Sequence, residues 1–130
     1  MGSYILVVDN NPMNLEFISY LLTAKGYAVK TAASVDLGLD LMRKSTPCLI
    51  ISDLFLPHRG GFDFLKQIKE VTAWKDIPFV MISATSYLKS DVERAQQLGA
   101  NKFIFRPIEP QRLLNEIEPY LEGCSSQRSH

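Results

Sequence analysis

The chain has 130 residues, of which 46% are hydrophobic and 22% charged, a composition typical of a single globular domain with its own core. Lysine plus arginine and aspartate plus glutamate both number 14, so the formal net charge is +0, which argues against a broad surface for nucleic acid or anionic membranes. No apolar run approaches the roughly 20 residues that span a bilayer, and the first residues lack the features of a signal peptide. We therefore expect a cytoplasmic protein.

The first third of the chain alternates between strand and helix patterns. The apolar run at 4–8 predicts a buried strand. A helix follows, with Asn11 as its N-cap and Pro12 at its first position, and Gly26 can end it. Residues 27–33 predict a second strand.

The segment from Val35 to Met42 fits two patterns. Its apolar residues alternate as in a strand, but they also recur at helical spacing through Val35, Leu39 and Met42. Because Ser34 can cap a helix and the segment lies between two predicted strands, we expect a helix.

The rest of the chain continues the alternation. Gly60 and Gly61 predict a turn, Gly99 the end of a helix and Pro110 the start of the last one, which Pro119 should kink or end early. The predicted strands are 48–53, 77–83 and 102–105, and the predicted helices are 62–71, 88–98 and 110–121. We expect one domain over 1–121 and a loose polar tail over 122–130.

The two cysteines stand far apart in the sequence. Cys48 begins a buried run and Cys124 lies in the polar tail, and neither belongs to a CxxC or other metal-ligand spacing. We therefore expect two free thiols in a reducing compartment.

Five strand–helix units with strands apolar on both faces predict an α/β fold, in which a doubly wound, five-stranded parallel sheet is covered by helices on both faces. Sites in such sheets lie at the carboxyl ends of the strands. The residues that end or follow the strands there are Asp9, Asn10, Asp53, Ser83 and Arg106. Each alone could cap a helix or form a surface ion pair; together they fit phosphoryl transfer to a carboxylate, assisted by Mg²⁺.

The segments "LVVDNNPMN", "LIISDLFLPHRGGFDFL", "VMISA" and "FIFRPI" carry a family resemblance in their order and spacing. Over residues 4–121 the chain resembles the receiver domain of bacterial two-component response regulators, the CheY-like family, which has a three-layer, flavodoxin-like (βα)5 fold. The resemblance implies a phosphorelay receiver that takes a phosphoryl group from a histidine kinase or phosphotransfer protein onto Asp53.

The resemblance also implies roles for the neighbouring residues. Asp9, Asn10 and Asp53, with the backbone carbonyl of Phe55, would bind Mg²⁺. Ser83 and Arg106 would contact the phosphoryl group. Phe103 would switch together with Ser83. Ala84 would keep access to the site open. The loop residues Pro57 and Gly61 also match the family pattern.

Partners follow from the same resemblance. A downstream protein or a second copy would bind the face formed by the helix at 88–98, the strand at 102–105 and the last helix. We expect no direct binding of nucleic acid or membrane, and no enzyme activity beyond Mg²⁺-assisted self-phosphorylation and dephosphorylation.

Two positions depart from the family pattern. Asn10 stands where a second acid is usual, so metal affinity should fall. Arg106 stands where lysine is usual, and could reach the phosphoryl oxygen from another angle or pair with Asp53 beforehand. Both changes support an alternative, a pseudo-receiver that binds proteins without phosphorylation.

A third hypothesis is an enzyme or cofactor carrier on the same fold. The turn after the first strand lacks glycine, Phe55 stands where a hydrolase would keep a second acid, and Ser83 has no GxSxG elbow. His58 fits a surface histidine better than a base.

Overall fold

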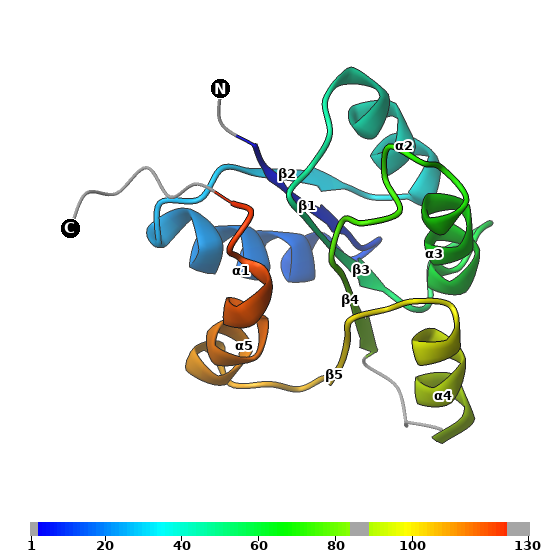
Figure 1. Ribbon diagram of the computed structural model, residues 1–130. Helices are drawn as coiled ribbons and strands as arrows, with labels where there is room; N and C mark the ends of the chain where they lie inside the picture. Colours follow the sequence, from blue (N-terminus) through cyan, green and yellow to red (C-terminus); the bar gives the residue numbers. More distant parts are fainter. Residues whose placement is uncertain (1–2, 84–88, 125–130) are drawn as a thin grey trace.

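The computed structural model describes residues 3–83 and 89–124, and over these the strands and helices alternate as predicted (Figure 1). The strands are β1 (Ile5–Val8), β2 (Val29–Ala32), β3 (Leu49–Asp53), β4 (Phe79–Ser83) and β5 (Lys102–Phe105). The helices are α1 (Pro12–Ala24), α2 (Val35–Lys44), α3 (Gly61–Lys69), α4 (Lys89–Gln97), α5 (Pro110–Ile117) and a short 3₁₀ helix (Glu118–Tyr120).

The five strands form one parallel sheet in the order β2-β1-β3-β4-β5. Helices α1 and α5 cover one face, and α2, α3 and α4 lie on the other (Figure 1). Alternate residues of β1 enter different cores: Leu6 and Val8 pack with α2 and α3, whereas Ile5 and Val7 pack with α1 and α5. These helices on both faces of a parallel sheet confirm the predicted doubly wound α/β fold. The strands are buried on both faces, and such strands need a helical layer on each side.

Capping residues explain where the first two helices begin. The side chain of Asn11 accepts a hydrogen bond from the N–H of Met13 at 2.9 Å. The hydroxyl of Ser34 likewise accepts from the N–H of Leu37 at 3.2 Å, and the ambiguous segment after it is a helix. Helix α5 stops at Ile117, and Pro119 lies in the 3₁₀ turn that follows, as its missing N–H predicts.

Strands β2 and β4 each begin two residues later than their apolar runs predict. The N–H of Tyr27 donates to the carbonyl of Leu22, so Tyr27 lies at the exit of α1, where it makes an isolated β-bridge, and β2 begins at Val29. The N–H of Ile77 donates to the carbonyl of Trp74, so Ile77 closes a turn and β4 begins at Phe79. Both residues are apolar because they pack against the core, and an apolar run alone cannot separate that role from strand pairing.

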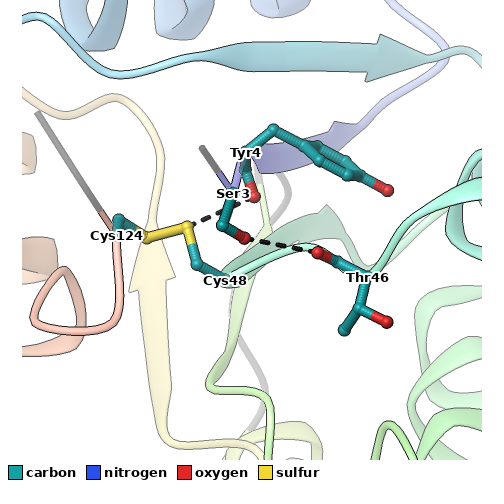
Figure 2. The surroundings of a disulfide bond; sticks show 5 residues. All are labelled: Ser3, Tyr4, Thr46, Cys48 and Cys124. Carbon is teal, nitrogen blue, oxygen red and sulfur yellow. Dashed lines mark hydrogen bonds between the residues drawn. A yellow bond between two sulfur atoms is a disulfide. The ribbon is translucent and has the colours of Figure 1, made fainter. Parts of the chain in front are cut away.

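Cys48 and Cys124 form a disulfide, so the prediction of two free thiols is wrong (Figure 2). The turn after the 3₁₀ helix, in which the N–H of Cys124 donates to the carbonyl of Leu121, brings Cys124 beside Cys48 at the start of β3. The Cα atoms are 5.3 Å apart across a sequence separation of 76 residues. Such a pairing depends on the folded path of the chain, which spacing in the sequence does not show.

The disulfide changes two related expectations. Cys124, placed by the sequence in a loose tail, is fixed against the core of the α1 and α5 side; residues 125–130 lie outside the described part. A disulfide does not fit the reducing compartment that two free thiols predicted, and the cytoplasmic location stays a prediction. Within residues 3–83 and 89–124, no helix is both long and apolar enough to cross a membrane.

Candidate functional site

The parallel register brings the predicted site residues to one edge of the sheet. Val8 pairs with Ser52, so Asp9 and Asp53 follow side by side at the ends of β1 and β3. Ser83 ends the next strand, β4, and its carbonyl accepts a hydrogen bond from the N–H of Arg106 at 2.8 Å. Two carboxylates, a hydroxyl and a guanidinium therefore meet at the carboxyl edge, as the sequence predicts.

Asp9 is buried, with 1% of its surface exposed, and both of its carboxylate oxygens are hydrogen-bonded. Oδ1 accepts from the N–H of Asn11 at 2.9 Å, and Oδ2 accepts from Nη2 of Arg106 at 2.8 Å. The first bond fixes the carboxylate to the turn that starts α1, and the second is a charge-assisted bond in a poorly solvated place.

Asp53 is the last residue of β3 and is 9% exposed. Its Oδ1 accepts from the N–H of Phe55 at 3.3 Å, and its Oδ2 lies 3.8 Å from Nη1 of Arg106. Burial raises the pKa of the Asp53 carboxyl, and the charge of Asp9 raises it further; Arg106 and the N–H groups of Phe55 and Leu54 oppose this shift. The carboxylate is thus one whose negative charge is only partly compensated.

Gly61 allows the start of α3 to pack directly behind Asp53. A Cβ at this position would lie 2.6 Å from the carbonyl oxygen of Asp53 and 2.8 Å from the sulfur of Met81. The N–H of Gly61 donates to the carbonyl of Leu54 at 2.8 Å, which closes the loop after the strand. Glycine is therefore required here for a close approach of two backbones.

Arg106 lies between the two carboxylates. Its side chain is 14% exposed, and the Arg106–Pro107 peptide bond is cis. Nη2 is bonded to Asp9, whereas Nη1 is buried and has no hydrogen-bond partner among the described residues. The sequence predicted that Arg106 reaches this edge; its closer partner is Asp9, not Asp53.

The other predicted residues differ in their placement. Ser83 is buried, with 2% of its surface exposed. Phe103 is half-buried, packs against the core on the α2 and α3 side and lies 5.2 Å, centroid to centroid, from the ring of Phe105. Asn10 is exposed. Ala84 lies outside the described residues.

The donor chemistry of this edge fits a hard divalent cation. The carboxylates of Asp9 and Asp53, the amide oxygen of Asn10 and the carbonyl of Phe55 are oxygen ligands of the kind that Mg²⁺ prefers. The repulsion between Asp9 and Asp53 is what a bound cation would relieve. Within the described part of the chain, no group of three or more histidine, cysteine, aspartate or glutamate side chains could hold a metal, so the set stops at two acids.

Comparison with known proteins agrees with this geometry. The family model of the response regulator receiver domain matches residues 5–118. The polar-differentiation response regulator DivK of Brucella ovis is 31% identical over 122 residues, covering 93% of this chain and 98% of that protein. The structure of the chemotaxis response regulator CheY4 of Vibrio cholerae superposes with a TM-score of 0.85 at 27% identity, covering 93% of this chain and all of that one.

The chain is a response regulator receiver domain. The receiver domain of NtrX from Brucella abortus is a further structural relative, 29% identical with a TM-score of 0.78, covering 91% of this chain and 98% of that one. This receiver domain acts in two-component phosphorelay signal transduction, and the pseudo-receiver alternative is not favoured. Receiver domains are generally not classical enzymes; they generally bind Mg²⁺ at the acidic pocket, receive phosphoryl groups from histidine kinases and act on downstream partners.

Proposed function

We propose that Asp53 is the phosphoryl acceptor of this receiver domain. The observation that carries the proposal is the pairing of Asp53 Oδ2 with Arg106 Nη1, a buried donor without a hydrogen-bond partner in the described structure, 3.8 Å away. The Asp53 carboxylate oxygen faces a cationic donor that is not hydrogen-bonded. This arrangement suits an oxygen that receives a phosphoryl group, because the guanidinium can then neutralise the added negative charge.

The reaction is a group transfer in which Asp53 is the nucleophile. Its carboxylate oxygen forms a bond to phosphorus while the nitrogen–phosphorus bond of a phosphohistidine breaks, and the electron pair of that bond stays on the imidazole nitrogen, which takes a proton from water. The product is an acyl phosphate. Mg²⁺, held by Asp9, Asn10, Asp53 and the carbonyl of Phe55, would supply neutralisation of the transferring oxygens.

Ser83 and Arg106 contact the phosphoryl group in this proposal. The Ser83 hydroxyl, at the end of β4, donates to one oxygen, and the guanidinium of Arg106 donates to another. Ser83 can make this contact only once Asp53 carries the phosphoryl group. The contact therefore changes the relative free energies of the two conformations of the domain, as any switch requires. As Ser83 makes this contact, the ring of Phe103 on β5 changes its packing.

The output face is formed by α4, β5 and α5. A groove of about 590 Å³ crosses β5 and α5, with Phe103 and Phe105 in its lining, and the ring of Phe105 is 41% exposed. An ion pair between Lys102 and Glu116 at 2.9 Å lies in the same groove. Partly exposed aromatic rings beside charges of both signs suit a protein partner or a second copy more than nucleic acid or membrane.

The test is the intact mass of the protein after incubation with acetyl phosphate and Mg²⁺. We expect one added phosphoryl group on the wild type and none on Asp53→Asn. Asp63→Asn, which removes an exposed carboxylate in the first turn of α3, is the matched control and should still be labelled. Label on Asp53→Asn, or a wild type that stays unlabelled while folded, would overturn the proposal.

A further inference from the structure

The guanidinium of Arg106 bridges the two carboxylates of the site. Nη2 lies 2.8 Å from Asp9 Oδ2, and Nη1 lies 3.8 Å from Asp53 Oδ2. The planar fork of an arginine presents two donors at once, whereas a lysine presents one compact charge. This chain thus holds its own cation between the acids that would bind a metal.

Both carboxylate oxygens of Asp9 already accept a hydrogen bond while this ion pair is closed, so a metal would have to share an oxygen with Asn11 or with Arg106. Oδ1 is bonded to the N–H of Asn11, which is fixed in the backbone turn that caps α1, and Oδ2 is bonded to Arg106. Asp9 is 1% exposed, so neither oxygen is turned towards bulk water. Of the two bonds, the one to the long side chain of Arg106 is the one that rotation about side-chain torsions can break.

The remaining ligands do not compensate for this. Position 10 supplies a neutral, exposed amide, and the described residues hold no third acid for a metal. Among the described residues Asp53 is the one further charged ligand that a cation would meet at this edge, so a cation that cannot reach Asp9 loses half of the negative charge of the site.

We propose that Arg106 and Mg²⁺ compete for Asp9, so that metal binding requires the Arg106–Asp9 ion pair to open. The inference rests on the proposed function, in that the metal site is the phosphorylation site. Arg106 is then a positioning and gating residue. While its ion pair with Asp9 is closed, the guanidinium neutralises Asp9 and lowers the affinity of the site for the metal. Once the metal has opened this ion pair, the guanidinium is available to the phosphoryl group.

The test is a calorimetric titration with MgCl₂ alone, at fixed ionic strength and without a phosphodonor. We expect Arg106→Gln to bind Mg²⁺ about tenfold more tightly than the wild type, because the competing cation is gone. Arg112→Gln is the matched control: it removes a 72% exposed guanidinium 3.8 Å from Glu116 in α5, and should change affinity little. Thermal unfolding confirms that each variant is folded.

A second measurement reads the guanidinium directly in the wild type. Mg²⁺ should shift the side-chain NMR signals of Arg106 and leave those of Arg112 in place. Equal affinities of wild type and Arg106→Gln, a gain matched by Arg112→Gln, absence of Mg²⁺ binding in both, or unmoved Arg106 signals would overturn the competition.

These outcomes are separable from the fate of the proposed function. If Arg106→Gln binds Mg²⁺ more tightly but acetyl phosphate never labels Asp53, the competition stands and the acceptor assignment fails. If Asp53 is labelled but the affinities are equal, the acceptor assignment stands and the competition fails.

Discussion

Asp53 is a buried carboxylate whose negative charge lowers the stability of the folded domain. Burial and the neighbouring charge of Asp9 raise the pKa of its carboxyl, and Arg106 compensates only in part. The folded state therefore keeps the Asp53 proton to a higher pH than the unfolded state does. Stability contributed by the protonated form is present below the ordinary pKa of aspartate and is lost as the pH rises through the raised value.

Replacing Asp53 by asparagine should therefore stabilise the domain at neutral pH. We expect a higher urea midpoint for Asp53→Asn than for the wild type at pH 7 in the presence of EDTA, because the variant carries no buried charge beside Asp9. The advantage should shrink as the pH falls towards 4, because folded wild-type Asp53, whose pKa is raised, takes up its proton before the ordinary pKa of aspartate is reached. A variant less stable than the wild type at pH 7 would show that the pair with Arg106 outweighs burial.

At this scale the sequence predicted which residues meet but not how they pair. Asp53 and Ser83 end their strands, and Asp9 and Arg106 directly follow theirs; because parallel strands end at one edge, the meeting of these residues follows from the pattern. Arg106 has a long side chain that can reach either carboxylate. Its preference for Asp9 depends on distances of 2.8 and 3.8 Å that no sequence pattern contains.

Helix α3 packs against the end of β3 more closely than most helices could. Gly60 precedes it as N-cap without a side-chain hydrogen bond, and Gly61 begins it in contact with the backbone of Asp53 and Leu54. The helix is held by the packing of its buried residues, Phe64, Leu65 and Ile68, rather than by a cap.

A methyl group at Gly61 should push this element away from the site. We expect Gly61→Ala to lower the free energy of unfolding by about 1–3 kcal/mol, because the new Cβ would meet backbone that cannot rotate aside. Gly123→Ala is the control, since a Cβ there meets nothing within 4 Å. Urea unfolding of both variants measures the difference; equal stabilities would mean that α3 shifts without cost.

The elements show where periodicity is informative and where it is not. Five strands and their helices were predictable because buried parallel strands are continuous apolar runs between amphipathic helices. The first residues of β2 and β4 were not, since Tyr27 and Ile77 are apolar for packing while their N–H groups close turns. For Val35 to Met42, the cap at Ser34 decided what the apolar pattern left open.

The whole molecule is closed by a covalent link that the sequence did not predict. Cys48 precedes β3 and Cys124 follows the last helical turn, and the disulfide joins them across 76 residues (Figure 2). Hydrophobic pattern and charge say nothing about the path of the chain end, so two distant cysteines read as unpaired. The link fixes the C-terminal turn at the end of the sheet opposite Asp53.

Removing the disulfide should lower stability without changing the fold. We expect Cys124→Ser to lose about 2–4 kcal/mol of unfolding free energy, because the unfolded chain regains the freedom of a long closed loop. The wild type in excess dithiol should unfold at the same urea concentration as the variant, which makes reduction the matched control. A thiol assay on the denatured, unreduced wild type should find no free thiol; two free thiols would contradict the pairing.

The disulfide also determines which segments of the chain would carry a mechanical load. Tension applied between the two chain ends would pass through residues up to Cys48, cross the sulfur–sulfur bond to Cys124 and bypass the closed loop between them. Asp53 and Arg106 lie inside that shielded loop, whereas Asp9 lies on the loaded segment. Force would therefore act first on the contacts of β1, the Arg106–Asp9 ion pair among them, while β3 and Asp53 bear none of it.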